Sequence, residues 1–412
     1  MTWKETRLKH LCIDSGQYGL NVAADNYAAT GTRLIRTSDI APDGTLKDAE
    51  CGVHVDMAIG DRHQLIAGDI LLSRSGTLGR SFLVPEQAQG DTFAGFLIRF
   101  RPKPEVEPRF LNYATQSSGF QGTVHSQAVA STIQNFNAER YANISLRIPS
   151  TDEQRRIADF LDAETVRIDQ LIALRTRQVR LAEEKRASSL DSAFKRDTHS
   201  PTRLKRLLAG RPRYGVLVPH FVDGDGVRFI RVNDLLDLPG RADSLRRIPH
   251  ELSSQYARTI TRPGDVLLSV VGTMGRSAIV TADLEGANVA RAVASLRPKS
   301  HVSAELVAAW LTTPDFIRQA MNATSSDTAQ PTLGMEDLAN FKLSWPSSPP
   351  AQRELLQKAQ TIQHHCNCLV DVFQAQSRLL AERRRALITA AVTGQFDVST
   401  ASSRNVTEGV FA

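Results

Sequence analysis

The sequence contains little of what several large protein classes require. Its 412 residues include only four cysteines, which are too few for a disulfide-rich scaffold. No apolar run is as long as the roughly 18 residues that a membrane-spanning helix needs. No apolar core follows the N-terminal residues either, so we expect no signal peptide. These absences predict a cytoplasmic protein that has no membrane partner.

Motifs of common catalytic sites are missing as well. The sequence has no G-x-x-x-x-G-K-[ST] phosphate loop, no G-x-G-x-x-G after a strand, and no Asn/Asp-Pro-Pro-Tyr/Phe motif of amino-methyltransferases. Glu183, Glu184 and Lys185 resemble part of a nuclease metal site, but they fall inside a predicted charged helix and indicate a solvated face. Residues 364–368 (HHCNC) carry zinc-binding side chains, yet ligands two apart on a helix point in different directions and no second pair follows. We therefore predict no catalytic residue and no metal site in this chain.

The composition is that of an ordinary globular protein. Hydrophobic residues make up 41% and charged residues 23%, which excludes wholesale disorder. At roughly 150 residues per domain, the length suggests two or three domains. Fifty Lys and Arg against 44 Asp and Glu leave a net charge of +6, which permits a polyanionic partner without requiring one.

An internal duplication organises the chain. Residues 68–84 (GDILLSRSGTLGRSFLV) return as residues 264–280 (GDVLLSVVGTMGRSAIV), with 11 of 17 positions identical. Shorter matches flank this pair at almost the same offset: 6–11 with 202–207, 33–39 with 228–234, and 101–103 with 297–299. The copies are therefore full-length repeats of domain size rather than the short units of a solenoid.

Each copy has the same two parts. The first part mixes short apolar runs with Gly, Pro, Asn and Asp turns, which is typical of an α+β domain. The second part has no Gly or Pro over residues 151–196 and again over 351–393, which predicts two long helices. We expect α+β domains at 1–150 and 200–347, long helices at 151–199 and 348–396, and a disordered tail at 397–412.

Local signals mark the ends of these helices. Ser150 followed by Glu153 forms a capping box at the start of the first helix. Ser348 can cap the second helix, with Pro349 at its first position. Gly394 is expected to stop it.

A heptad pattern predicts how the helices pack. In the second helix, apolar positions alternate steps of four and three through Leu355, Ala359, Ile362, Cys366, Leu369, Phe373, Gln376, Leu380, Arg383, Leu387 and Ala390. The first helix carries Ile157, Leu161, Ile168 and Leu171 in the equivalent register. We predict that the two helices pair as an antiparallel coiled coil. The alternative is that each helix packs on its own domain.

These motifs resemble those of a known family, the specificity (S) subunits of type I restriction-modification enzymes. The resemblance covers nearly the whole chain and rests on the paired G-D-[IV]-L-L-S-x-x-G-T-x-G-R segments, on residues 148–162 (IPSTDEQRRIADFLD), and on residues 336–341 (EDLANF). The second copy departs from the family at 351–353, where Ala-Gln-Arg stands in place of the usual Glu-Gln-Arg.

The resemblance implies a division of labour among subunits. Each α+β domain would be a target recognition domain that recognises one half of a bipartite site in double-stranded DNA. The paired helices would set the spacer and dock two modification (methyltransferase) subunits. The chain itself would catalyse nothing and hold no cofactor, because S-adenosylmethionine, ATP and magnesium would belong to the modification and restriction (nuclease-translocase) subunits.

The duplication also predicts which residues meet DNA. Residues identical in both copies cannot distinguish two half-sites, so they should build the turns or contact phosphate, whereas polar loop positions that differ should contact bases. The resulting candidates are Arg33, Arg36, Arg74, Ser75, Thr77, Arg80, Thr132, Gln134, Asn135, Arg228, Arg231, Thr273, Arg276, Gln330 and Thr332. The alternative is that these loops are merely variable surface.

Three other interpretations remain open at this stage. The chain could carry its own nuclease or methyltransferase site, which the missing motifs argue against. It could be a coiled-coil scaffold with no role on DNA, which does not explain two diverged α+β domains. It could also be the specificity chain of another multisubunit restriction-methylation system.

Overall fold

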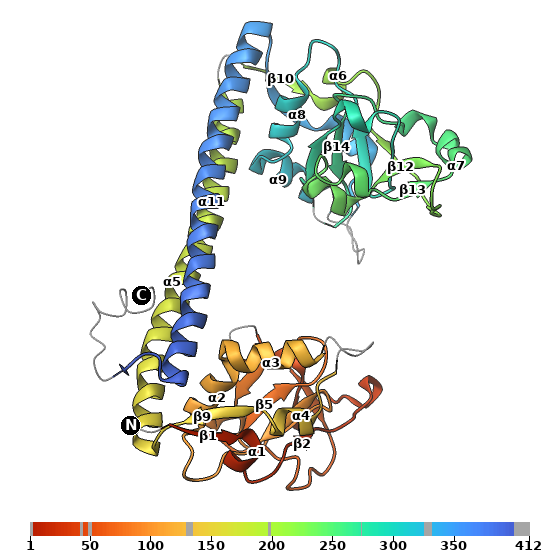
Figure 1. Cartoon of the computed structure of the whole chain (residues 1–412). Coiled ribbons are helices and arrows are strands. Elements are labelled where there is room, and N and C mark those ends of the chain that lie inside the picture. The colour runs from red at the N-terminus through yellow and green to blue at the C-terminus, as the bar shows by residue number, and fades with distance from the viewer. Residues whose placement is uncertain are drawn as a thin grey trace. The chain divides into compact units, whose positions relative to one another are not determined.

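The computed structural model describes residues 3–41, 44–47, 52–128, 135–196, 199–272, 274–324 and 332–398. The chain divides into two compact units (Figure 1). Unit 1 consists of Met1–Arg175 and Ala375–Ala412, and unit 2 consists of Thr176–Gln374. Unit 1 is therefore built from both ends of the chain and unit 2 from its middle.

The described residues of unit 1 form three small sheets. The four-stranded sheet has the order β2-β8-β5-β6 and is antiparallel throughout, and the three-stranded sheet has the order β4-β3-β7, in which β3 and β7 are parallel. A third ladder joins β1 to β9. The strands are β1 (Lys4–Arg7), β2 (Gln17–Tyr18), β3 (Thr32–Ile35), β4 (Val53–Val55), β5 (Ile70–Ser73), β6 (Ser81–Leu83), β7 (Thr92–Phe93), β8 (Leu97–Phe100) and β9 (Ser145–Ile148).

Short helices cover these sheets in unit 1. They are α1 (Leu8–Leu11), α2 (Pro108–Gln116), α3 (Ser118–Ala128) and α4 (Ala138–Ala142), with 3-10 turns η1 (Ala24–Asn26), η2 (Thr37–Asp39) and η4 (Glu86–Ala88). Alternate residues of β5 point into different cores: Ile70 and Leu72 face the core shared with the helices, whereas Leu71 faces the core beneath β3 and β7. This strand is buried on both faces, which explains its continuous apolar run.

Unit 2 repeats this topology strand for strand. Its sheets have the orders β11-β17-β14-β15 and β13-β12-β16, and β10 pairs with β18. The strands are β10 (His199–Arg203), β11 (Arg213–Tyr214), β12 (Val227–Ile230), β13 (Arg247–Ile248), β14 (Val266–Ser269), β15 (Ser277–Ile279), β16 (Asn288–Val289), β17 (Val293–Leu296) and β18 (Lys342–Pro346). The helices are α6 (Leu204–Leu207), α7 (His250–Gln255), α8 (Ala304–Trp310), α9 (Pro314–Ala323) and α10 (Met335–Asn340), with 3-10 turns η5 (Val232–Leu236), η6 (Ala242–Ser244), η7 (Ala257–Thr259) and η8 (Ala282–Leu284). The predicted duplication is confirmed.

A buried ion pair accounts for two of the repeated motifs. Asp69 is fully buried and accepts hydrogen bonds from both Nε and Nη2 of Arg101, at 2.8 and 2.9 Å. Asp265 binds Arg297 in the same bidentate way, at 2.7 Å for each bond. The hydrogen bonds to the aspartates raise the pKa of both arginines, so the guanidinium groups stay charged. The shared Gly-Asp and Arg-Pro-Lys segments therefore form one structural tie in each unit.

The two predicted long helices are α5 (Thr151–Phe194) and α11 (Pro349–Thr393). The N–H of Glu153 donates to Ser150 Oγ at 3.4 Å, which is one half of the predicted capping box, whereas the Glu153 carboxylate binds Arg156. Gly394 adopts a φ of 74° at the predicted end of the second helix. Helix α5 is shorter than the predicted 151–199, because β10 begins at His199 and Pro201 follows. Helix α11 ends three residues before the predicted 396, and Phe396 packs against Phe160 with ring centroids 5.6 Å apart. Val398 of the predicted tail 397–412 is also packed on the core, so the described start of that tail is ordered.

Helices α5 and α11 run antiparallel in each unit, as predicted. In unit 1, Phe160 contacts Phe396, and Arg384 binds Asp169 at 3.1 Å. In unit 2 the contacts are Cys366 Sγ to the carbonyl of Ala182 at 3.5 Å, Arg186 to Gln363 at 2.9 Å, and Arg196 to Glu354 at 2.8 Å. The residue numbers rise on one helix as they fall on the other.

The helices also pack on the domains, so the alternative interpretation holds in part. In unit 1, Leu387 lies in one core with Ile157 and Phe110. In unit 2, Leu355 and Ala359 share a core with Trp345. The heptad positions nearest the domains are therefore the most buried, and several positions in the middle of α11 are only half-buried.

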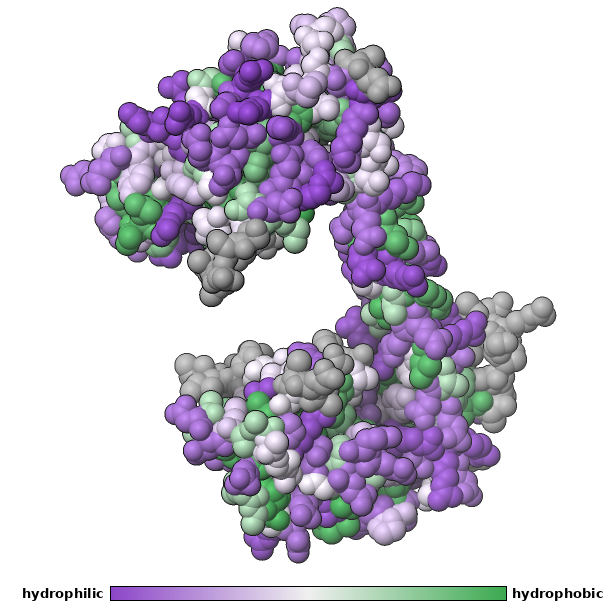
Figure 2. All heavy atoms as spheres, turned by 180° about the vertical axis from the view of Figure 1, so that it is seen from behind, coloured by the Kyte–Doolittle hydropathy of each residue, from purple (hydrophilic) through white to green (hydrophobic). Residues whose placement is uncertain are grey.

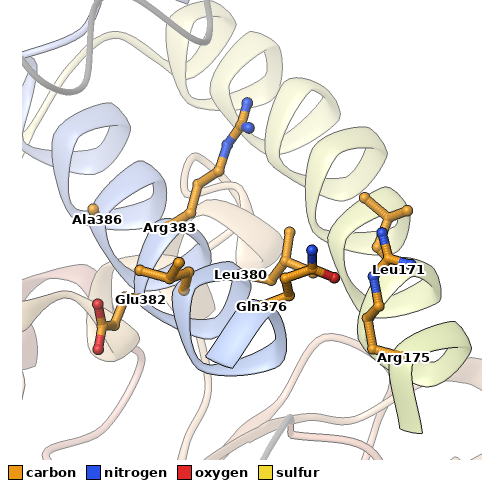
Figure 3. Close-up of a pocket in the computed structure, with 8 residues that line it drawn as sticks. Leu171, Arg175, Gln376, Leu380, Glu382, Arg383 and Ala386 are labelled. Atoms are coloured by element: carbon orange, nitrogen blue, oxygen red, sulfur yellow. The ribbon is translucent and has the colours of Figure 1, made fainter. Parts of the chain in front are cut away.

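The predicted heptad position Leu171 lies outside the core. Leu171 is 36% exposed and lines a groove of about 470 Å³ in unit 1, together with Arg175 of α5 and Gln376, Leu379, Leu380, Glu382, Arg383 and Ala386 of α11. Figure 3 shows Gln376 and Leu380 opposite Leu171 and Arg175. The polar Gln376 and Arg383 occupy seam positions here, so the helices meet less closely and a groove remains.

No helix among the described residues is long and apolar enough to cross a membrane.

Candidate nucleic-acid interface

The paired Gly-Thr-x-Gly loops connect β5 to β6 and β14 to β15. All four glycines have positive φ values: 73° at Gly76, 75° at Gly79, 74° at Gly272 and 82° at Gly275. This left-handed conformation strongly favours glycine. The backbone conformation alone therefore explains why glycine occupies all four positions.

In unit 1 this loop borders a cavity of about 490 Å³. Four predicted site residues line it: Arg36, Ser75, Thr77 and Arg80. The cavity adds residues that the sequence analysis missed, namely Asn21, Tyr27, Lys47 and Phe96. Three cationic side chains and an exposed aromatic ring surround one concave surface, which suits a polyanion that carries stacked bases.

Two of the shared arginines are bound to aspartates. Arg36 donates to Asp39 from Nε at 3.1 Å and from Nη2 at 2.9 Å, and this hydrogen bond raises the pKa of Arg36. Arg231 donates to Asp234 from Nε at 3.1 Å and Nη2 at 3.3 Å. Both pairs also fix the start of a 3-10 turn, because each aspartate accepts from the arginine's own N–H at 2.9 Å. These contacts favour the structural role for Arg36 and Arg231, although 30% and 43% of their side chains stay exposed.

Other shared arginines are held less tightly. Arg80 donates from Nη1 to the carbonyl of Ile40 at 2.5 Å, and Arg33 on β3 donates from Nη2 to the carbonyl of Lys47 at 3.4 Å. Their counterparts Arg276 and Arg228 are half-buried, the latter on β12. Arg80 is the best placed of the shared arginines to meet a ligand in the cavity, because it lines the cavity and forms no ion pair with the described aspartates.

The first variable loop of unit 1 is joined to the second. Arg74 donates from Nε to Asn135 Oδ1 at 3.3 Å and lies over the ring of Tyr18, 4.8 Å from its centroid. The backbone of Ser75 bridges that of Asn135. The structure thus brings together two predicted base-contacting loops that lie 60 residues apart in the sequence.

Unit 2 joins the matching loops with different side chains. Val271 bridges Thr332, and Thr332 is exposed. Val270, at the position of Arg74, is fully buried. The adjacent polar residues Arg74 and Ser75 of unit 1 are therefore replaced by Val270 and Val271 on the same backbone. Thr132, Gln134, Thr273 and Gln330 lie outside the described residues.

A buried tyrosine ties the loop of unit 1 to α4. Tyr141 Oη accepts from the N–H of Gly79 at 3.1 Å and donates to the carbonyl of Ser73 at 2.8 Å. Burial raises the pKa of Tyr141, so the phenol stays protonated and can make both bonds. The matching position in unit 2 is Leu338, which has no hydroxyl group.

Metal-binding clusters do not appear among the described residues: no three His, Cys, Asp or Glu side chains gather as ligands. Cys368 does contact His364, with Sγ 3.6 Å from Nε2, because residues four apart share a helix face. The sequence-based prediction missed this pair, because it compared possible ligands two residues apart and not four residues apart. Two ligands alone do not complete a zinc site.

Residues 55–178 match the family model described as the type I restriction modification DNA specificity domain. The chain is similar to the specificity subunit of the type I restriction enzyme EcoBI from Escherichia coli, with 27% identity over 307 residues. The match covers 66% of this chain and 64% of that relative, just under two thirds of its length.

One solved structure shows the same fold. A chain from a study of complex assembly and conformational transition in a type I R-M system aligns with a TM-score of 0.65 and 18% identity, covering 96% of this chain and 98% of that one. The crystal structure of the HsdS subunit from Thermoanaerobacter tengcongensis aligns with a TM-score of 0.46 and 20% identity, covering 96% and 97% of the two chains.

Proposed function

We propose that this chain is a specificity subunit of a type I restriction-modification system, the subunit that selects the DNA sequence to be modified. Each α+β domain recognises one half of a bipartite site in double-stranded DNA. The two long helices fix the spacer between the half-sites. One observation carries this proposal: the two domains share a backbone frame strand for strand, yet differ in the side chains of their matched loops.

The proposal assigns different roles to Arg74 and Arg80. Arg74 lies in a variable loop and can donate two hydrogen bonds to a guanine, a contact worth about 1–3 kcal/mol of discrimination. Arg80 is shared by both copies and lines the basic cavity, so it contacts phosphate without regard to sequence.

Methylation-site sequencing tests these roles in the chain assembled with its modification subunits. Arg74→Ala should relax one half-site and spare the other. Arg80→Ala should weaken binding to all sequences alike and lower its salt dependence. Arg147→Ala removes an exposed arginine of β9 outside the cavity and should change neither property. An unchanged motif in Arg74→Ala together with an altered base preference in Arg80→Ala would reverse the assignment.

The chain works without chemistry of its own in this proposal. S-adenosylmethionine, ATP and magnesium bind the modification and restriction subunits. The purified chain should therefore neither methylate nor cut DNA, and methyl transfer should appear when a modification subunit is added. Labelling of DNA by the isolated chain, free of contaminating enzyme, would contradict this.

The groove between α5 and α11 in unit 1 is the proposed docking site for a modification subunit. Leu171 and Leu379 are 36% and 64% exposed there, beside the charged Arg383 and Glu382. Leu379→Asp should weaken assembly with the modification subunit in analytical ultracentrifugation. Val372→Asp is the matched control, because Val372 is 50% exposed on the same helix and does not line the groove. Equal assembly by wild type and Leu379→Asp would place the docking site elsewhere.

A further inference from the structure

In each unit, the same backbone hydrogen bonds join two short segments into a ledge, which in unit 1 lies beside the Gly-Thr-x-Gly loop. In unit 1 the segment after β2 joins the segment after β7: Leu20 N donates to the carbonyl of Phe93 and Gly95 N donates to the carbonyl of Leu20, both at 2.8 Å. The first bond requires close approach, because a Cβ at Gly19 would lie 2.3 Å from the carbonyl oxygen of Phe93. This ledge, residues 20–22 with 94–96, forms one wall of the basic cavity.

Unit 2 contains the same ledge at residues 216–218 and 290–292. Val216 N donates to the carbonyl of Val289 at 2.8 Å, and Arg291 N donates to the carbonyl of Val216 at 2.9 Å. A Cβ at Gly215 would lie 1.8 Å from the carbonyl oxygen of Val289, so glycine is required here too. Positions 21, 22 and 95 of unit 1 therefore correspond to 217, 218 and 291 of unit 2.

The side chains on the two ledges differ in chemistry. Asn21 of unit 1 is replaced by Leu217, which is 55% exposed, whereas Val22 is retained as Val218, which is 79% exposed. Gly95 is replaced by Arg291, an exposed cation. Unit 2 thus presents two adjacent apolar side chains beside an arginine. Hydrophilic residues dominate the face of the molecule drawn in Figure 2, where hydrophobic residues form only separate patches.

Apolar side chains make no hydrogen bonds to base edges. On the major-groove edges of the four bases, the apolar recognition group is the C5-methyl of thymine. Arg291 supplies the charge that holds such a ledge against a phosphate backbone. If the ledge of unit 2 faces DNA, as the proposed function implies, an exposed Leu-Val pair on it matches a thymine and mismatches the other bases.

Resting on the proposed function, we propose that Leu217 and Val218 contact the 5-methyl group of a thymine in the half-site recognised by unit 2. The contact excludes water from one methyl group. Loss of this contact should weaken binding about threefold to fourfold, which is the factor that corresponds to the free energy of transferring one methyl group out of water. Unit 1 has Asn21 at the first of these positions and makes no equivalent contact through that residue.

Uracil provides the test, because it keeps the hydrogen-bonding edge of thymine and lacks only the methyl group. The chain is assembled with its modification subunits and its methylated motif is determined by sequencing. Each thymine of both half-sites is then replaced singly by uracil in a duplex, and binding is measured. One replacement should weaken binding by the stated factor. The double variant Leu217→Asn, Val218→Thr should bind the thymine and uracil duplexes equally. Leu236→Asn changes a 64% exposed leucine of η5 away from the ledge and should keep the discrimination.

The outcomes separate this inference from the proposed function. Sequence-specific binding that no uracil replacement weakens, or a motif without thymine, overturns the inference and leaves the proposed function standing. Loss of subunit assembly in the double variant would make the ledge a protein interface and also overturns it. Absence of any sequence-specific binding by the assembled complex refutes the proposed function itself.

Discussion

Tyr141→Phe should loosen the recognition loop of unit 1 and leave unit 2 unaffected. The side chain of Tyr141 is fully buried, and its hydroxyl joins the two ends of the loop through Gly79 N and the carbonyl of Ser73. Phenylalanine fills the same space but leaves both backbone groups without this partner. A buried polar group that loses its hydrogen bond costs about 1–3 kcal/mol.

The contacts around the loop place the cost at the lower end of this range. Gly79 N also reaches the carbonyl of Ser73 at 3.3 Å, so these two groups retain each other when the hydroxyl is removed. We therefore expect the free energy of unfolding of unit 1 to fall by about 1 kcal/mol. For a unit of this size, the melting temperature should fall by about 2–4 °C.

The functional readout is the methylated motif of the assembled complex. The half-site of unit 1 should become less strictly recognised, and the half-site of unit 2, where Leu338 stands at the matching position, should not change. Tyr113→Phe is the matched control. Tyr113 donates to Asp162 at 2.7 Å on α5, far along the chain from the loop, so its loss should lower stability with an unchanged motif. If Tyr141→Phe and Tyr113→Phe have the same effect on the motif, the hydroxyl of Tyr141 does not position the loop.

Two further predictions concern the core and the cysteines. Leu387→Ala should lower the free energy of unfolding of unit 1 by about 2–5 kcal/mol in urea unfolding, because Leu387 is fully buried. The control Leu379→Ala removes a side chain that is 64% exposed and should cost less than about 0.5 kcal/mol. Equal losses in the two variants would show that α11 packs differently. Burial raises the pKa of Cys12 to about 12, so at pH 8 iodoacetamide should modify the exposed Cys368 and leave Cys12 unmodified in the folded chain. Mass spectrometry of the two cysteine-containing peptides measures this, and rapid labelling of Cys12 would contradict its burial.

Elements defined by local pattern were predictable from the sequence. The repeats predicted two domains of one topology, and the absence of Gly and Pro predicted α5 and α11 to within a few residues. The role of Arg36 was left open, because a sequence shows that an arginine is repeated but not which carboxylate it meets. Asp39, three residues later, binds it in the structure.

Contacts between distant segments were not predictable in the same way. The ring of Tyr18 beneath Arg74 and the hydroxyl of Tyr141 beneath Gly79 depend on how strands and helices far apart in sequence come together. Leu171 fits the heptad spacing and is still exposed, because its neighbours across the seam include Gln376 and Arg383. Periodicity predicts which face of a helix turns inward, and the partner side chains determine whether that face closes.

The division of unit 1 between the two ends of the chain has a consequence for biosynthesis. Its core contains Ile157, Leu161 and Ile168 from the early part of α5 and Leu387 from the end of α11. About 200 residues separate these two contributions, so at 5–20 residues per second the ribosome needs roughly 10–40 s to supply the second after the first. Unit 2 is contiguous in sequence and can close as soon as it emerges. The first domain to be translated is therefore the last to be completed, and its helical seam stays exposed to chaperones and proteases until translation reaches the final turns of α11.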